Sequence, residues 1–188
     1  MNNKSILGLA LASTLLLSGA SYKPDIIQQE PVAEKKEYIK LDSSRLTPPE
    51  KQVFDFLTER GITDRGAMAT ILGNIRAESM FHPNICEGGA RVRYEDCRRG
   101  GYGLIQWTTI NRYDGLGNFA QKYGGDPSSL KTQLRYMVNE YQWKNIEHKF
   151  KTPGKSISYY MDAAYYWLGW GIHGNRTHYA YDYYAKLG

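Results

Sequence analysis

The chain has 188 residues, which leaves room for one domain of ordinary size once any targeting segment is removed. Hydrophobic residues make up 41% of the chain, enough for a core, so disorder throughout the chain is excluded. The net charge of +5 and the isoelectric point near 9.1 suit an anionic partner, which leaves bacterial cell wall, nucleic acid and membrane surface open.

The first 20 residues have the features of an export signal. Lys4 precedes an apolar run over residues 6–17, and the small residues Ser18-Gly19-Ala20 follow it. This order is typical of a secretory signal peptide. A permanent span normally needs about 20 apolar residues, so no stable membrane span is expected after processing, with a releasable signal-anchor as the alternative. We therefore expect export to the periplasm or the extracellular space.

Residues 21–46 carry mixed charge, two prolines and no sustained periodicity, which predicts a flexible linker. Folding signals begin at Thr47, so we expect one folded domain over residues 47–188. Thr47 and Glu50 have the spacing of a capping box, which predicts a helix that Gly61 ends. A second helix is expected from Thr63 or Asp64 to about Ser79.

The rest of the chain predicts further helices and one irregular region. Residues 100–108 contain several glycines between apolar and aromatic residues, which predicts a strand or hairpin. Helices are expected from Asp126-Pro127 through Tyr141, over Ile157 to Leu168, and from Asn175 to near Leu187. The predicted fold class is α+β but mainly α, a helical domain with a small β region.

The two cysteines, Cys86 and Cys97, flank one Gly- and Arg-rich stretch. In an oxidising compartment they favour a disulfide that closes this loop, worth about 3 kcal/mol. A zinc site would need two more ligands, and His82 is the nearest candidate, so no metal or other cofactor is expected. A cysteine peptidase that pairs one of these thiols with a histidine is a rival interpretation, with His148, His173 and His178 as the candidates.

Glu78 is the residue most suited to acid catalysis. It follows Ile71 and Ile75 at helical spacing, so its carboxyl group shares the apolar face of the second helix. Burial disfavours the ionised form and raises the pKa of a carboxyl group, as cleavage of a glycosidic bond by a general acid requires. A frayed helix end, with Glu78 in solvent or paired with Arg76 or an arginine of the cysteine loop, is the structural alternative.

Two segments resemble the phage tail lysozyme family, which is similar to lytic transglycosylases and goose-type lysozymes. They are Glu78-Ser79-Met80-Phe81-His82-Pro83 and, after the cysteine loop, Gly101-Tyr102-Gly103-Leu104-Ile105-Gln106-Trp107. The resemblance extends over roughly residues 48–187 and includes Thr132-Gln133-Leu134. It departs from the family at Met80, where a glycine is usual, and in the longer link that carries the cysteines.

The resemblance implies a lysozyme-like catalytic domain that cleaves peptidoglycan glycan strands between N-acetylmuramic acid and N-acetylglucosamine. Glu78 would be the general acid/base. Ser79, Tyr102, Gln106 and Trp107 would bind the substrate, with a core tryptophan packed beneath the strand as the equal alternative for Trp107. The protein would act as a monomer on peptidoglycan, and no nucleic-acid-reading motif is present.

Three questions stay open at this level. Hydrolysis normally uses a second carboxylate, for which Glu87, Glu95 and Asp96 are candidates, whereas a lytic transglycosylase needs only one acid/base residue. The arginines of the cysteine loop either meet anionic polymer or are simply solvated. A non-catalytic glycan-binding or assembly protein of the same fold is the remaining alternative function.

Overall fold

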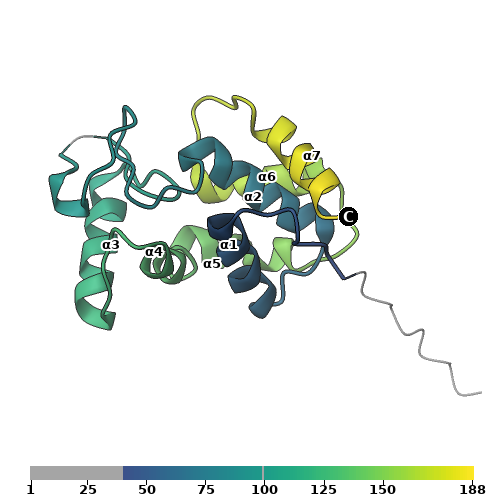
Figure 1. The fold of residues 1–188 in the computed structure, drawn as a ribbon, viewed down its shortest axis with the longest axis horizontal. Coiled ribbons are helices and arrows are strands. Elements are labelled where there is room, and N and C mark those ends of the chain that lie inside the picture. The colour runs from purple at the N-terminus through teal and green to yellow at the C-terminus, as the bar shows by residue number, and fades with distance from the viewer. Residues whose placement is uncertain (1–39, 99) are drawn as a thin grey trace, which may run out of the picture. The chain divides into compact units, whose positions relative to one another are not determined.

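A computed structural model describes residues 40–98 and 100–188 of the chain (Figure 1). The expected signal segment, residues 1–20, and most of the expected linker, residues 21–46, lie outside the described residues. The end of that stretch contacts the helical domain. Leu41 and Leu46 pack against its core, and the backbone N–H of Asp42 donates to the carbonyl of Leu187 over 3.0 Å.

The described residues are mainly helical, as expected, and one turn of 3-10 helix, Tyr94–Asp96, interrupts the cysteine loop. None of the helices in the described part of the chain is long and apolar enough to cross a membrane. The α-helices are α1 (Pro48–Glu59), α2 (Arg65–Ser79), α3 (Ile110–Tyr123), α4 (Leu130–Met137), α5 (Tyr141–Phe150), α6 (Ile157–Leu168) and α7 (Arg176–Lys186).

The sequence signals at the first two helices are confirmed. The backbone N–H of Thr47 donates to the carboxylate of Glu50 over 2.7 Å, as in a capping box, and α1 starts at the next residue. Asp64 caps α2 by accepting from the backbone N–H of Ala67 over 2.9 Å. The helices expected over residues 157–168 and after Asn175 are also present.

The helix expected from Asp126-Pro127 through Tyr141 is wrong in its extent. The structure has two helices there, because α4 ends at Met137 and α5 begins at Tyr141, with Glu140 as its N-cap. Asp126 instead accepts from the backbone N–H of Ser128, in a turn before α4. α3 was not expected from the sequence, and its two internal glycines, Gly115 and Gly117, weaken the helical signal.

The small β region does not form a sheet within the described residues. Isolated antiparallel bridges take its place and pair Ile85 with Arg91, Cys86 with Tyr102, and Tyr102 with Trp107. The 100–108 segment is therefore a tight turn held by bridges rather than a strand.

Helix α2 lies at the centre of the domain (Figure 1). It packs mainly against α7 and also contacts α6 and α1. Residues 66–75 of α2 are all buried, as expected for a helix covered on every side. α7 crosses it closely at Gly73, where an added Cβ would lie 2.5 Å from the backbone nitrogen of Ala180. This crossing brings the C-terminal end of α2 near the first turn of α7.

Candidate functional site

The chain turns sharply after Ser79, at the end of α2. Met80 and Phe81 both have left-handed backbone conformations, with φ of 51° and 64°. Such φ values are uncommon outside glycine, and they often occur at functional sites. Met80 thus takes the conformation expected of a glycine at this position, and its side chain is exposed, whereas Phe81 is buried against Tyr183. The turn leaves Glu78 at the edge of the core.

The carboxyl group of Glu78 is nearly buried and paired with an arginine. Its side chain is 13% exposed, and its Oε1 lies 2.8 Å from Nη2 of Arg176, the first residue of α7. Burial raises the pKa of Glu78, while Arg176 and, more weakly, Arg112 act in the opposite direction. Since the effect of burial is larger, the site favours the protonated carboxyl group more than water does.

Arg176 is an unusual partner because little of its own charge is neutralised elsewhere. Its side chain is 10% exposed, and its Nε and Nη1 atoms are buried with no hydrogen-bond partner among the described residues. The guanidinium also stacks on the ring of Trp170, 4.8 Å from the ring centroid. No local sequence pattern identifies Arg176 as the partner of Glu78, because the two residues lie far apart in the chain.

Ser79 and a glutamine on α4 hold the turn over residues 101–107 against the end of α2. The hydroxyl of Ser79, which is buried, donates to the carbonyl of Leu104 over 2.7 Å. The buried side chain of Gln133 accepts from the backbone N–H of Leu104 over 2.8 Å and donates to the carbonyls of Pro83 and Pro127. Sequence analysis matched Gln133 to the family but did not identify this role.

Gln106 lies in the same turn, with a left-handed φ of 52°. Its side chain is half-buried, and its amide donates to the carbonyl of Gly103 over 3.0 Å. The amide also donates to the carbonyl of Ile85 over 3.4 Å, which leaves the side-chain oxygen Oε1 as the polar atom available to a ligand.

The substrate contacts expected of Tyr102 and Trp107 need correction, because neither side chain is exposed. The hydroxyl of Tyr102 donates to the carbonyl of Val92 over 3.1 Å and lies 2.9 Å from the hydroxyl of Ser128. The indole N–H of Trp107 donates over 2.9 Å to Glu140. Both rings are covered by protein, so they support the turn from beneath rather than contacting a sugar.

Glu140, the N-cap of α5, has a structural role. It is buried and receives two hydrogen bonds from Arg112, over 2.7 and 2.9 Å, in addition to that of Trp107. This pairing links α3 to the start of α5 and fixes the end of the 101–107 turn.

Cys86 and Cys97 form the expected disulfide, with their Cα atoms 5.6 Å apart. Since a cysteine peptidase or a cysteine-ligated metal site needs a thiolate, the bond rules out both alternatives for this state of the protein.

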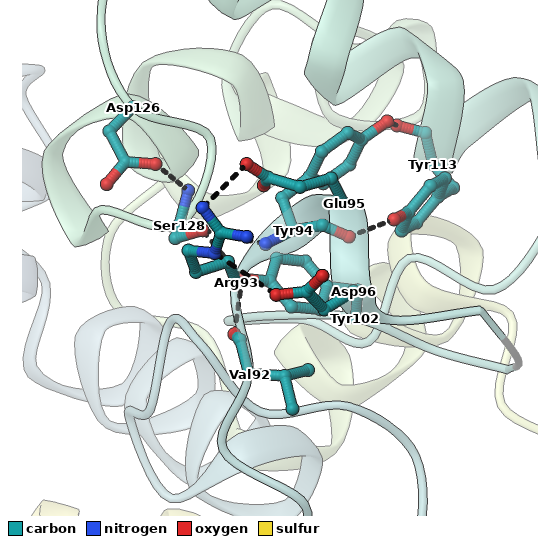
Figure 2. A network of polar contacts seen from close by, with 9 residues as sticks. All are labelled: Val92, Arg93, Tyr94, Glu95, Asp96, Tyr102, Tyr113, Asp126 and Ser128. Carbon is teal, nitrogen blue, oxygen red and sulfur yellow. Dashed lines mark hydrogen bonds and ion pairs between the residues drawn. The ribbon is translucent and has the colours of Figure 1, made fainter.

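Polar contacts anchor the cysteine loop to the rest of the domain, as Figure 2 shows. The backbone N–H of Tyr94 donates to the hydroxyl of Ser128, and the hydroxyl of Tyr113 donates to the carbonyl of Tyr94. Glu95 and Asp96, two candidates for a second carboxylate, form ion pairs with Arg93.

The third candidate, Glu87, is also engaged, since it accepts from the backbone N–H of Gly101 over 3.1 Å. All three carboxylates are on exposed residues. None therefore has the buried environment of Glu78.

Two comparisons with known proteins show what this chain is similar to. The family model described as phage tail lysozyme matches residues 49–187. Morphogenesis protein 1 of Bacillus phage B103 is 29% identical over 125 residues. That match covers 62% of this chain and 31% of the relative, so the chain spans about a third of the length of that protein. From the family match over most of its length, the chain belongs to the phage tail lysozyme family.

Proposed function

We propose that the protein cleaves peptidoglycan glycan strands between N-acetylmuramic acid and N-acetylglucosamine, with Glu78 as general acid/base. The observation that carries the proposal is the state of this carboxyl group. Within residues 40–98 and 100–188, four carboxyl groups have a pKa that departs from its ordinary value. Three are lowered (Asp42, Glu50 and Glu147), and only that of Glu78 is raised, by burial.

The chemistry begins with proton transfer from Glu78 to the oxygen that links two sugars. The bond from that oxygen to the anomeric carbon breaks, and an oxocarbenium-like centre develops. Ionised Glu78 is then stabilised by Arg176, 2.8 Å away. In the second half of the reaction Glu78 takes a proton from the attacking hydroxyl group, so the same ion pair serves both halves.

The attacking hydroxyl group is either water or the 6-hydroxyl of the sugar itself. Water usually needs a second carboxylate to orient it. Because Glu87, Glu95 and Asp96 are exposed and engaged in other contacts, the one-carboxylate route with an anhydro product is the better supported of the two.

The test is a Glu78→Gln variant in a turbidity assay on purified cell walls. Glu59→Gln is the matched control, since Glu59 is exposed at the end of α1 and the substitution is the same. We expect lysis to fall by about a thousandfold in Glu78→Gln and to be unchanged in the control. Undiminished lysis in Glu78→Gln would mean that Glu78 is not the acid. Mass spectrometry of the soluble products distinguishes anhydro ends from reducing ends.

The alternative function is that of a non-catalytic wall-binding or assembly protein. The name of the phage relative, Morphogenesis protein 1, favours the assembly role among these. This alternative predicts binding to walls without release of soluble sugars by either the wild type or Glu78→Gln. Soluble products that depend on Glu78 decide against it.

The domain organisation belongs to the same proposal: a signal peptide or releasable signal-anchor over residues 1–20, a linker over 21–46 and a catalytic domain over 47–188. Export would bring the domain to peptidoglycan, where it acts as a monomer. The mass of the exported protein tests the cleavage after Ala20, and light scattering tests the monomer.

A further inference from the structure

A pocket of about 340 Å³ lies between α6 and α7, and Glu78 is not among its lining residues. This volume is at the small end of the range for ligand sites in proteins. Residues of both helices and of the loop between them line it: Ser158, Met161, Asp162, Tyr165, Trp170, His173, Thr177 and Tyr181.

The pocket is rich in aromatic rings that remain accessible. Tyr165 is 49% exposed and Tyr181 is 56% exposed, although tyrosine rings pack readily into a core. The ring of Trp170 meets that of Tyr165 edge to face, with centroids 5.5 Å apart. Two aromatic walls at a steep angle suit a flat ligand with an apolar face, such as a pyranose ring.

Polar groups stand beside these rings. Asp162 is exposed, and no ion pair or hydrogen bond engages it within the described residues. The hydroxyl of Thr177 lies 3.0 Å from Nε2 of His173. A carboxylate can accept hydrogen bonds from two neighbouring sugar hydroxyl groups, and aromatic rings cover the C–H face of the same sugar.

Trp170 joins this pocket to the site of Glu78. It lines the pocket, and it also stacks on Arg176, whose guanidinium pairs with the Glu78 carboxylate. Trp170 is therefore the residue through which the pocket adjoins the Arg176–Glu78 pair, and an extended polymer is a ligand of the right kind to span both.

We propose that the pocket between α6 and α7 binds a sugar ring of the same glycan strand that Glu78 cleaves, and so holds long strands better than short ones. This inference rests on the proposed function for the identity of the polymer. The pocket supplies affinity for a ring remote from the cleaved bond. A cationic side chain of a peptidoglycan stem peptide, attracted by Asp162, is the competing occupant.

The test uses the fluorescence of the full exported chain carrying Glu78→Gln, so that sugar oligomers are not consumed. Trp107, Trp143 and Trp167 have no exposed surface, so Trp170 is the tryptophan that a ligand can touch. Titration with the hexamer of N-acetylglucosamine should change the emission, and the dimer should bind at least tenfold more weakly.

Two pocket variants, Tyr165→Ala and Asp162→Asn, are added separately to Glu78→Gln. Each should weaken hexamer binding roughly tenfold, the size expected for one lost aromatic or charged contact. Tyr123→Ala is the matched control, because Tyr123 is 55% exposed on α3, with one neighbouring aromatic ring. It should leave hexamer binding unchanged.

Three results overturn the inference: unchanged hexamer affinity in both pocket variants, equal affinity for dimer and hexamer, or binding of a soluble stem peptide in preference to the hexamer. None of these depends on cleavage. Full lysis by Glu78→Gln in the wall assay would instead overturn the proposed function, so the two failures are distinguishable.

Discussion

Nη2 of Arg176 lies 2.8 Å from Oε1 of Glu78, although the two residues are 98 positions apart and belong to different helices. Both side chains are nearly buried. Burial favours the protonated carboxyl group, and the guanidinium favours the ionised one. The pKa of Glu78 therefore depends on two opposing effects: the burial of its side chain at the end of α2 and the charge of Arg176 on α7.

Removing Arg176 should raise the pKa of Glu78 further, because the attraction and the hydrogen bond that oppose burial are lost. If the reaction needs protonated Glu78, activity is lost as the pH rises through this pKa. In Arg176→Met the alkaline limb of the lysis profile should therefore move to higher pH, while peak activity falls because ionised Glu78 loses its partner. The measurement is initial lysis rate against pH.

Arg176→Lys keeps the cation and should leave the alkaline limb nearer to that of the wild type. Thermal unfolding of each variant shows how much activity is lost through instability. A role in folding alone would lower the rate at every pH without moving the limb, and that result would contradict the prediction.

The sequence predicted helices well where local signals were complete. The capping residues Thr47 and Asp64 stand directly before runs with apolar residues at helical spacing, and both helices begin there. The long helix expected after Asp126 was wrong because the apolar spacing continues across the break at 138–140. Only the tertiary contacts of Glu140, with Trp107 and Arg112, reveal that break.

The candidate site was predictable to the extent that it depends on one helix. Glu78 could be placed on the apolar face of α2 by spacing, whereas its partner Arg176 comes from the other end of the chain. Tyr102 was expected to contact substrate, and Trp107 either to contact substrate or to pack in the core, because an aromatic residue next to a glycine-rich turn looks the same whether it is exposed or buried. Their burial follows from tertiary packing, of Tyr102 against Tyr113 of α3 and of Trp107 against Tyr136 of α4.

Gln133→Leu should destabilise the turn over residues 101–107, which Ser79 joins to the end of α2. The substitution leaves the buried N–H of Leu104 without its acceptor and the carbonyls of Pro83 and Pro127 without their donor. Since each buried group left unpaired costs about 1–3 kcal/mol, we expect the free energy of unfolding to fall by about 3 kcal/mol. Urea denaturation measures it.

Gln121→Leu is the control for this experiment, because Gln121 is exposed on α3 and should change stability by less than about 0.5 kcal/mol. Equal urea midpoints for the two variants would show that the contacts of Gln133 are dispensable.

Replacing both Cys86 and Cys97 by alanine should lower the free energy of unfolding by about 3 kcal/mol, since the bond closes a loop with a sequence separation of 11. A reducing agent should lower the stability of the wild type by a similar amount and have no effect on the double variant. The contacts of Tyr94 and Tyr113 remain in both cases, so the loop should stay attached to the domain. A wild-type urea midpoint that does not respond to reductant would contradict this contribution.

Gly73→Ala tests whether the close crossing of α2 and α7 sets the geometry of the site. The added Cβ would lie 2.5 Å from the backbone nitrogen of Ala180, and a backbone atom cannot move aside alone. α7 must shift as a unit, and Arg176 lies one helical turn before Ala180, so the ion pair with Glu78 should lengthen. We expect a loss of about 2–3 kcal/mol in unfolding free energy together with a fall in lysis. Gly171→Ala, where a Cβ meets open space, serves as the stability control. If Gly73→Ala unfolds at the same urea concentration as Gly171→Ala, the crossing is looser than the distance indicates.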